Sequence, residues 1–136
     1  MRFFPLPQVG DLVWCRFPHE GLTRPGPKPR PALVIAVGEL RGAPAIEVLY
    51  GTSRKLDRLY AGEFSVTPED GAAFTLSGLS YPTKFDTTRP VFLPLNDEWF
   101  AVAPGAPHGQ TPKLGVLHPA LLPRIKAAAR AGKKRR

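Results

Sequence analysis

The sequence contains only one cysteine, Cys15, and three scattered histidines. One cysteine excludes an intramolecular disulfide and a cysteine-based metal cluster. Cys15 lies in an apolar, strand-like stretch, which favours a buried structural thiol over a nucleophile. The histidines form no ligand pair at helical or turn spacing, and no glycine loop of the P-loop type is present. We therefore expect neither a metal ion nor a cofactor.

Long hydrophobic runs are also missing, and none approaches the length that crosses a bilayer. The first seven residues, Met1–Pro7, lack the apolar core of a signal peptide because prolines interrupt them. These observations predict a soluble cytoplasmic protein without membrane association.

Acidic residues are absent from positions 124–136, which hold seven of the 19 lysines and arginines. The formal net charge is +8, so the rest of the chain is nearly neutral. Any basic binding site on the body of the protein must therefore be local. We expect the C-terminal cations to belong to a helix near 119–131 and to a basic, disordered tail at 132–136.

Proline and glycine, in contrast, are abundant, with 17 and 13 residues among 136. This content disfavours a helical bundle and suits short strands joined by turns. The length suits one domain, here 1–131. We expect a mainly β fold, a small barrel of about six to seven short strands with a C-terminal helix. The predicted strands are 12–17, 32–38, 45–50, 64–66, 74–76, 84–85 and 91–93, with 99–102 as an eighth candidate and 103–113 as a loop.

The most informative stretch is Lys28–Val37, where a basic, proline-rich loop gives way to six apolar residues. Ala32–Val37 is too short for a typical helix and predicts a strand buried on both faces. Pro29 and Pro31 restrict the backbone on both sides of Arg30. A cation held at the rim of a core strand can bind an anionic ligand at little entropic cost. The alternatives are that Arg30 is solvated or pairs with an acid.

Three segments in order carry a resemblance to a known family: Gly10–Trp14, Arg30–Ile35 and Thr52-Ser53. Their order and spacing resemble the MazF/PemK toxins of type II toxin–antitoxin systems. A weaker likeness continues through Gly78–Asp86, and the final helix fits in position only. The resemblance implies an SH3-like barrel that forms a homodimer. It also implies metal-independent cleavage of single-stranded RNA by the RNA's own 2′-hydroxyl, which leaves a 2′,3′-cyclic phosphate.

The resemblance further implies two partners, a cognate antitoxin protein that covers the RNA site and operator DNA that is bound only together with it. It assigns catalytic roles to Arg30 and Thr52. In some members of the family an acid near the position of Ser80 is the base, and no acid directly precedes Ser80 here. His19 and Glu20 in the loop before Arg30 are alternative bases, and His19 titrates in the useful range.

The remaining candidate residues for RNA binding are basic or carry a hydroxyl group. Ser53 is either a phosphate ligand or a turn residue, and Lys84 either binds phosphate or is a solvated strand residue. Tyr81 either stacks on a base or packs against the barrel. The full set of predicted RNA-binding residues is Lys28, Ser53, Arg54, Ser80 and Lys84.

A different class of function remains open at this point. The related toxin CcdB acts on gyrase without cutting RNA, so the barrel alone does not fix the chemistry. A non-catalytic binding module, or a toxin that acts on a protein target, is therefore the alternative to an endoribonuclease.

Overall fold

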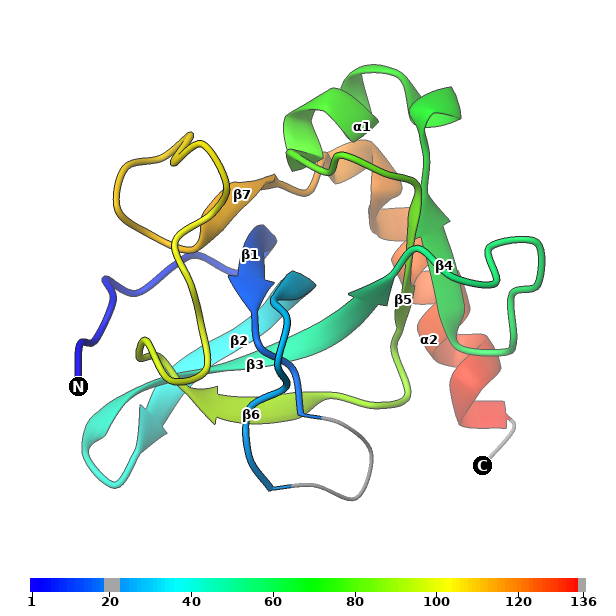
Figure 1. Ribbon diagram of the computed structural model, residues 1–136. Coiled ribbons are helices and arrows are strands. Elements are labelled where there is room, and N and C mark those ends of the chain that lie inside the picture. Colours follow the sequence, from blue (N-terminus) through cyan, green and yellow to red (C-terminus); the bar gives the residue numbers. More distant parts are fainter. Residues whose placement is uncertain (19–22, 135–136) are drawn as a thin grey trace.

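The computed structural model describes residues 1–18 and 23–134 (Figure 1). Within these ranges the fold is mainly β, a small barrel-like domain with one C-terminal helix. The strands are β1 (Asp11–Cys15), β2 (Arg30–Leu40), β3 (Ala43–Thr52), β4 (Glu63–Val66), β5 (Thr83–Asp86), β6 (Val91–Pro94) and β7 (Lys113–Val116). The helices are α1 (Ala72–Ser77) and α2 (Leu122–Lys134), with the 3₁₀ turns η1 (Pro68–Asp70) and η2 (Pro119–Leu121).

The long strand β3 organises one antiparallel sheet in the order β4-β5-β3-β2-β1-β7. It pairs with β2 along most of its length, while β6 joins its first half at Ala45–Val48. Its last two residues, Gly51 and Thr52, pair with β5. The sheet therefore bends along β3, and α2 packs beside β4 at the far end (Figure 1).

The β2–β3 pair is covered on both faces. Because successive side chains of a strand point to opposite faces, each strand contributes residues to both sides. On β3, Ile46 and Val48 enter one core cluster, shared with β1, β6 and Phe100. Leu49 enters the other cluster, shared with β4, β5 and the inner side of α2. Leu33 on β2 joins Leu49 in this second cluster. These two core clusters lie on opposite sides of the β2–β3 pair, and they hold the start of β2 and the end of β3 in position.

The predicted mainly β fold with a terminal helix is confirmed. The predicted strand buried on both faces is correct for Ala32–Val34 and wrong at its end, because Val37 is 44% exposed. The prediction of a buried thiol is confirmed, since Cys15 is fully buried and burial raises its pKa.

Two predicted elements are wrong. The proposed strand at 74–76 is helix α1, which buries Ala73 and Ser77 on one face at a spacing of four residues. Gly78 ends this helix in the left-handed conformation with φ +73°, where a side chain would collide with the Leu114 carbonyl. The candidate strand at 99–102 makes only one isolated bridge, from Phe100 to β1.

The predicted loop 103–113 and the predicted tail also need correction. Strand β7 begins at Lys113 and pairs with β1. The C-terminal helix begins as expected, with His118 as its cap, whose Nδ1 accepts a hydrogen bond from the Ala120 amide at 3.0 Å. Helix α2 continues to Lys134, so positions 132–134 of the expected tail are helical. Positions 135 and 136 lie outside the described residues.

Candidate functional site

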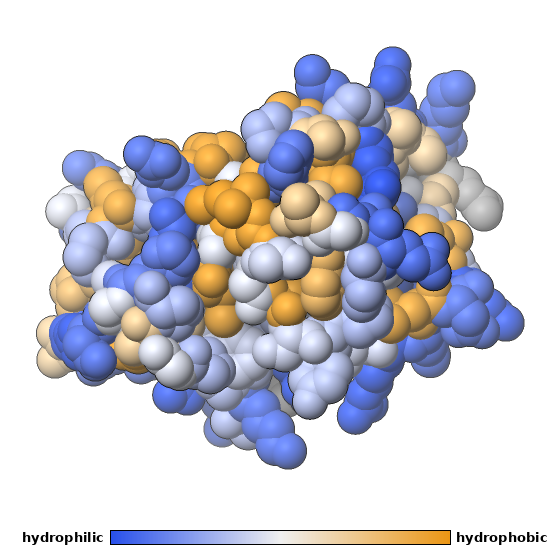
Figure 2. Space-filling view, turned by 90° about the horizontal axis from the view of Figure 1, so that it is seen from above, coloured by the Kyte–Doolittle hydropathy of each residue, from blue (hydrophilic) through white to orange (hydrophobic). Residues whose placement is uncertain are grey.

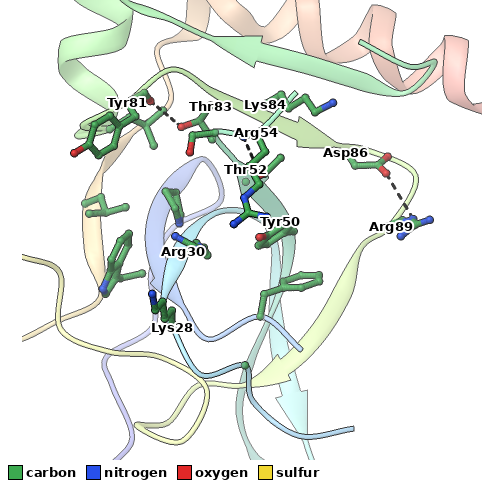
Figure 3. Close-up of a pocket in the computed structure, with 18 of the residues that line it drawn as sticks. Lys28, Arg30, Tyr50, Thr52, Arg54, Tyr81, Thr83, Lys84, Asp86 and Arg89 are labelled. Atoms are coloured by element: carbon green, nitrogen blue, oxygen red, sulfur yellow. Dashed lines mark hydrogen bonds and ion pairs between the residues drawn. The ribbon is translucent and has the colours of Figure 1, made fainter. Parts of the chain in front are cut away.

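An open groove of about 1440 Å³ lies where β2 begins and β3 ends (Figure 3). One wall comes from the start of β2 and the loop before it, and another from β5 and the segment that follows α1. The loop between β3 and β4 closes a third side. All predicted site residues that the structure describes line this groove: Lys28, Arg30, Thr52, Ser53, Arg54, Ser80 and Lys84. His19 lies outside the described residues.

Arg30 and Thr52 lie at the same end of the two central strands. The antiparallel register of β2 and β3 ends with Ala32 opposite Tyr50. Two residues further along, Arg30 pairs with β1 and Thr52 with β5. Both residues line the groove (Figure 3). This arrangement places a guanidinium and a hydroxyl group at the same open end of the strand pair.

The Arg30 side chain is exposed, and among the described residues it forms no hydrogen bond or ion pair. Two acids on the neighbouring strands, Asp11 and Glu47, do not bind it. Asp11 is buried and pairs with Lys113, with 3.5 Å between Oδ1 and Nζ. Glu47, half-buried on β3, takes part in no ion pair within the described chain. The Arg30 guanidinium is thus available to an anionic ligand.

The end of β3 turns back on itself at Thr52. The Thr52 Oγ1 accepts a hydrogen bond from the Arg54 amide at 3.2 Å, so the hydroxyl proton can still be donated to a ligand. Ser53 and Arg54 are exposed in this turn and border the groove. Ser53 therefore fits both of its proposed roles, as a turn residue and as a residue that faces a ligand.

Lys84 lines the groove but points toward β4 and away from Arg30 (Figure 3). Its side chain is 5% exposed, and its ammonium lies 3.0 Å from Glu63 Oε1 and 3.0 Å from the Arg58 carbonyl. The ring of Tyr60 lies 5.5 Å from the same nitrogen. The alternative of a solvated lysine is wrong. The contacts instead show an ammonium that anchors the β3–β4 loop.

Aromatic side chains give the groove apolar surfaces beside its cations. Tyr81 is 69% exposed and Tyr60 53% exposed, so both rings are open to a ligand. The alternative that Tyr81 packs in the core is therefore wrong, whereas packing at a strand edge stays a prediction. Phe17 and Tyr50, which also line the groove, form a ring pair with centroids 4.8 Å apart. Exposed rings beside basic groups are the combination that binds unstacked bases.

The described lining holds six basic side chains and two acidic ones, Glu63 and Asp86. Both acids are engaged. Glu63 bonds Lys84, and Asp86 Oδ1 accepts from the Thr88 amide at 2.8 Å and the Thr88 hydroxyl at 2.6 Å. Asp86 thus stabilises the turn that follows β5. Lys84 and Arg89 pair with these two acids, so the excess of basic groups that favours a polyanionic ligand comes from the other four cations. The six cations are Lys28, Arg30, Arg54, Lys55, Lys84 and Arg89.

The groove residues that were not predicted from the sequence include Tyr60, Glu63, Lys55 and Arg89. The first two lie near or beyond a loop without hydrophobic periodicity, which gave no sign of their position. No three metal-ligating side chains come together in residues 1–18 and 23–134. None of the described helices has the length and apolar character needed to cross a membrane. No protein-family model matches the chain, and no curated protein matches it.

Proposed function

We propose that the protein is a toxin of a type II toxin–antitoxin pair, a metal-independent endoribonuclease of the MazF/PemK kind that cleaves single-stranded RNA in the cytoplasm. The observation that carries this proposal is the exposed Arg30, which has no ion-pair partner in the described part of the chain, together with Thr52 in a basic groove with exposed tyrosines. The order of the sequence segments around these two residues supports the same class.

In the proposed reaction the 2′-hydroxyl of the RNA attacks the adjacent phosphorus, and the 5′-oxygen of the next nucleotide leaves. The phosphorane that forms carries extra negative charge. Arg30 stabilises this charge, since a preorganised cation acts most strongly where charge develops. The Thr52 hydroxyl donates to a non-bridging oxygen. His19, eleven positions before Arg30, is the proposed base on sequence grounds.

The groove also suits the partners that the resemblance implies. We propose that a segment of the cognate antitoxin covers the groove near Arg30, and that operator DNA is bound only by the toxin–antitoxin complex. The active toxin is proposed to be a homodimer.

The direct test is incubation of purified protein with single-stranded RNAs of mixed sequence in EDTA. The proposal expects cleavage at defined sites and products with 2′,3′-cyclic phosphate ends. A 2′-O-methyl group at the scissile nucleotide should abolish cleavage there because it removes the nucleophile. Intact RNA at high protein concentration would overturn the proposal.

A non-catalytic binding module is the second candidate. The observation in its favour is that Glu63 and Asp86, the acids in the described lining, are both committed to other protein groups. Such a module, including one that acts on a protein target, would bind its ligand in the same groove without breaking a bond. Tight RNA binding without cyclic-phosphate products in the same assay identifies it.

A further inference from the structure

The C-terminal end of α2 is packed against one rim of the groove. A Cβ atom on Gly132 would lie 3.1 Å from the Cα of Gly62 and 2.7 Å from a methyl group of Thr88. Gly62 itself has φ +95°, a conformation that side chains disfavour. Two glycines thus allow the helix end and the β3–β4 loop to approach more closely than any larger residues would permit.

The loops that touch this helix end also line the groove. Ala61 and Glu63 flank Gly62, and Thr88 and Arg89 follow β5. The Arg89 side chain is 66% exposed at this rim. Figure 1 shows α2 descending beside β4 and ending next to these loops. A strand of nucleic acid that leaves the groove on this side therefore meets the end of α2.

That end of the helix is strongly basic. Arg130, Lys133 and Lys134 are exposed, and their spacing of three and four residues places them on one side of the helix. Helix α2 holds no acid, and none of these three cations forms an ion pair within the described chain. Hydrophilic side chains project at the end of the molecule that carries α2 (Figure 2). The helix dipole favours cations in the last turn, but it does not explain why this turn lies beside the groove.

We propose that Arg130, Lys133 and Lys134 form a second phosphate-binding subsite, which holds the same single-stranded RNA beyond the nucleotides that occupy the groove. This inference rests on the proposed function for the identity of the ligand. A single strand is the fitting form, because the exposed Tyr60 and Tyr81 rings need unstacked bases. The subsite contacts phosphates only, so it adds affinity without sequence preference.

The test compares two variants of equal charge, Lys133→Gln with Lys134→Gln and the matched control Arg2→Gln with Arg41→Gln. Arg2 is exposed near the N-terminus and Arg41 is exposed in the β2–β3 turn, and neither lines the groove. The probes are fluorescent 2′-O-methyl RNAs of about six and about 20 nucleotides. Proteins that bind single strands cover about 4 to 16 nucleotides, so the short RNA fills the groove only and the long RNA also reaches the subsite. Fluorescence anisotropy at several salt concentrations gives the affinities.

The Lys133/Lys134 variant should lose affinity for the long RNA about three- to ten-fold at about 50 mM salt, because two phosphate contacts disappear. The slope of log affinity against log salt should become shallower by about 1.4 for the long RNA. The ratio of long-RNA to short-RNA affinity should therefore fall in this variant and stay constant in the control.

An equal loss on both RNA lengths, an equal loss in the Arg2/Arg41 control, or no loss at all would overturn the subsite. Cleavage of unmodified RNA is followed separately. Absence of cleavage contradicts the proposed function, whereas an unchanged length ratio contradicts the subsite, so each failure is recognised by its own measurement.

Discussion

Lys84 lies in the groove, where a lysine would be expected to bind phosphate, yet its contacts are to other groups of the protein. The ammonium bonds Glu63 and the Arg58 carbonyl, and the lysine is 5% exposed. A buried ion pair costs much of its Coulomb energy in desolvation, and removal of one partner leaves the other charge buried and uncompensated. We therefore infer that Lys84 holds the β3–β4 loop in place and does not bind phosphate directly.

We expect Lys84→Met to lower the free energy of unfolding by about 2–4 kcal/mol, because Glu63 would remain unpaired in a site that is 13% exposed. The double variant Lys84→Met with Glu63→Leu should recover most of this loss. Urea denaturation of both variants measures the difference. An unchanged stability for Lys84→Met, combined with lost RNA affinity, would show instead that the ammonium binds RNA.

At the scale of single residues, the sequence was sufficient to predict which candidate residues lie at the ends of strands. Arg30 begins a strand and Thr52 ends the next one, so a hairpin brings them to the same end of the strand pair. The register shift between Val34 and Ala36, which sets the pairing beyond it, was not predictable. The partner of Lys84 was not predictable. Glu63 is 21 residues away, across a loop without periodicity, and only the pairing of β4 with β5 brings the two together.

At the level of elements, the errors have physical causes. Phe74 and Leu76 alternate like strand residues, but Pro68 starts a helical turn and Ala72-Ala73 favours a helix. Strand β7 was missed because only Gly115 is buried in it, so it has no hydrophobic pattern to read. Its pairing with β1 depends on tertiary contact.

Helix α2 is fastened to the body of the protein by Arg124. Its guanidinium donates to both carboxylate oxygens of Asp70, at 2.9 and 3.0 Å, and to the Ser65 carbonyl at 2.9 Å. The hydrogen bonds from Arg124 lower the pKa of Asp70, and the Thr67 amide contributes to the same effect. This pair joins η1 to the first turn of α2.

The stabilisation from the Arg124–Asp70 pair should depend on pH. Because the folded-state pKa of Asp70 is depressed, its contribution is fully present above the unfolded-state value of about 3.9 and is lost as pH falls through the folded-state pKa. We expect Arg124→Met to destabilise the protein by at most about 1 kcal/mol at neutral pH, since the pair is partly exposed. Unfolding curves from pH 7 to pH 2 should show the two proteins converging in acid. A constant difference down to pH 2 would exclude this ion pair as the cause.

On the scale of the whole molecule, positive charge gathers in two neighbouring regions, the groove and the C-terminal end of α2. The groove collects six cations on a body that is nearly neutral overall, and the end of α2 adds several more. This agrees with the expectation that a basic site on the body must be local. The distribution suits a protein that binds one RNA strand over an extended path.

A toxin of the proposed kind should arrest growth when it is produced in bacterial cells without its antitoxin. The Arg30→Ala variant should relieve the arrest at equal protein level, while Arg41→Ala should not, because Arg41 lies outside the groove. Colony counts and protein blots after induction provide the measurement. Normal growth with abundant, folded wild-type protein would contradict the toxin assignment.

The measurement that tests the central claim most directly is RNA cleavage and thermal unfolding on one preparation of the Arg30→Ala protein. We predict a cleavage rate about 10²–10³ lower than that of the wild type, the loss expected for one preorganised charge-stabilising group. Arg30→Lys should restore only part of it, because an ammonium lacks the planar fork that matches two phosphate oxygens. The melting temperature should hardly change, since the side chain is exposed and forms no ion pair within residues 1–18 and 23–134. A folded Arg30→Ala protein that cleaves RNA at the wild-type rate would contradict the account.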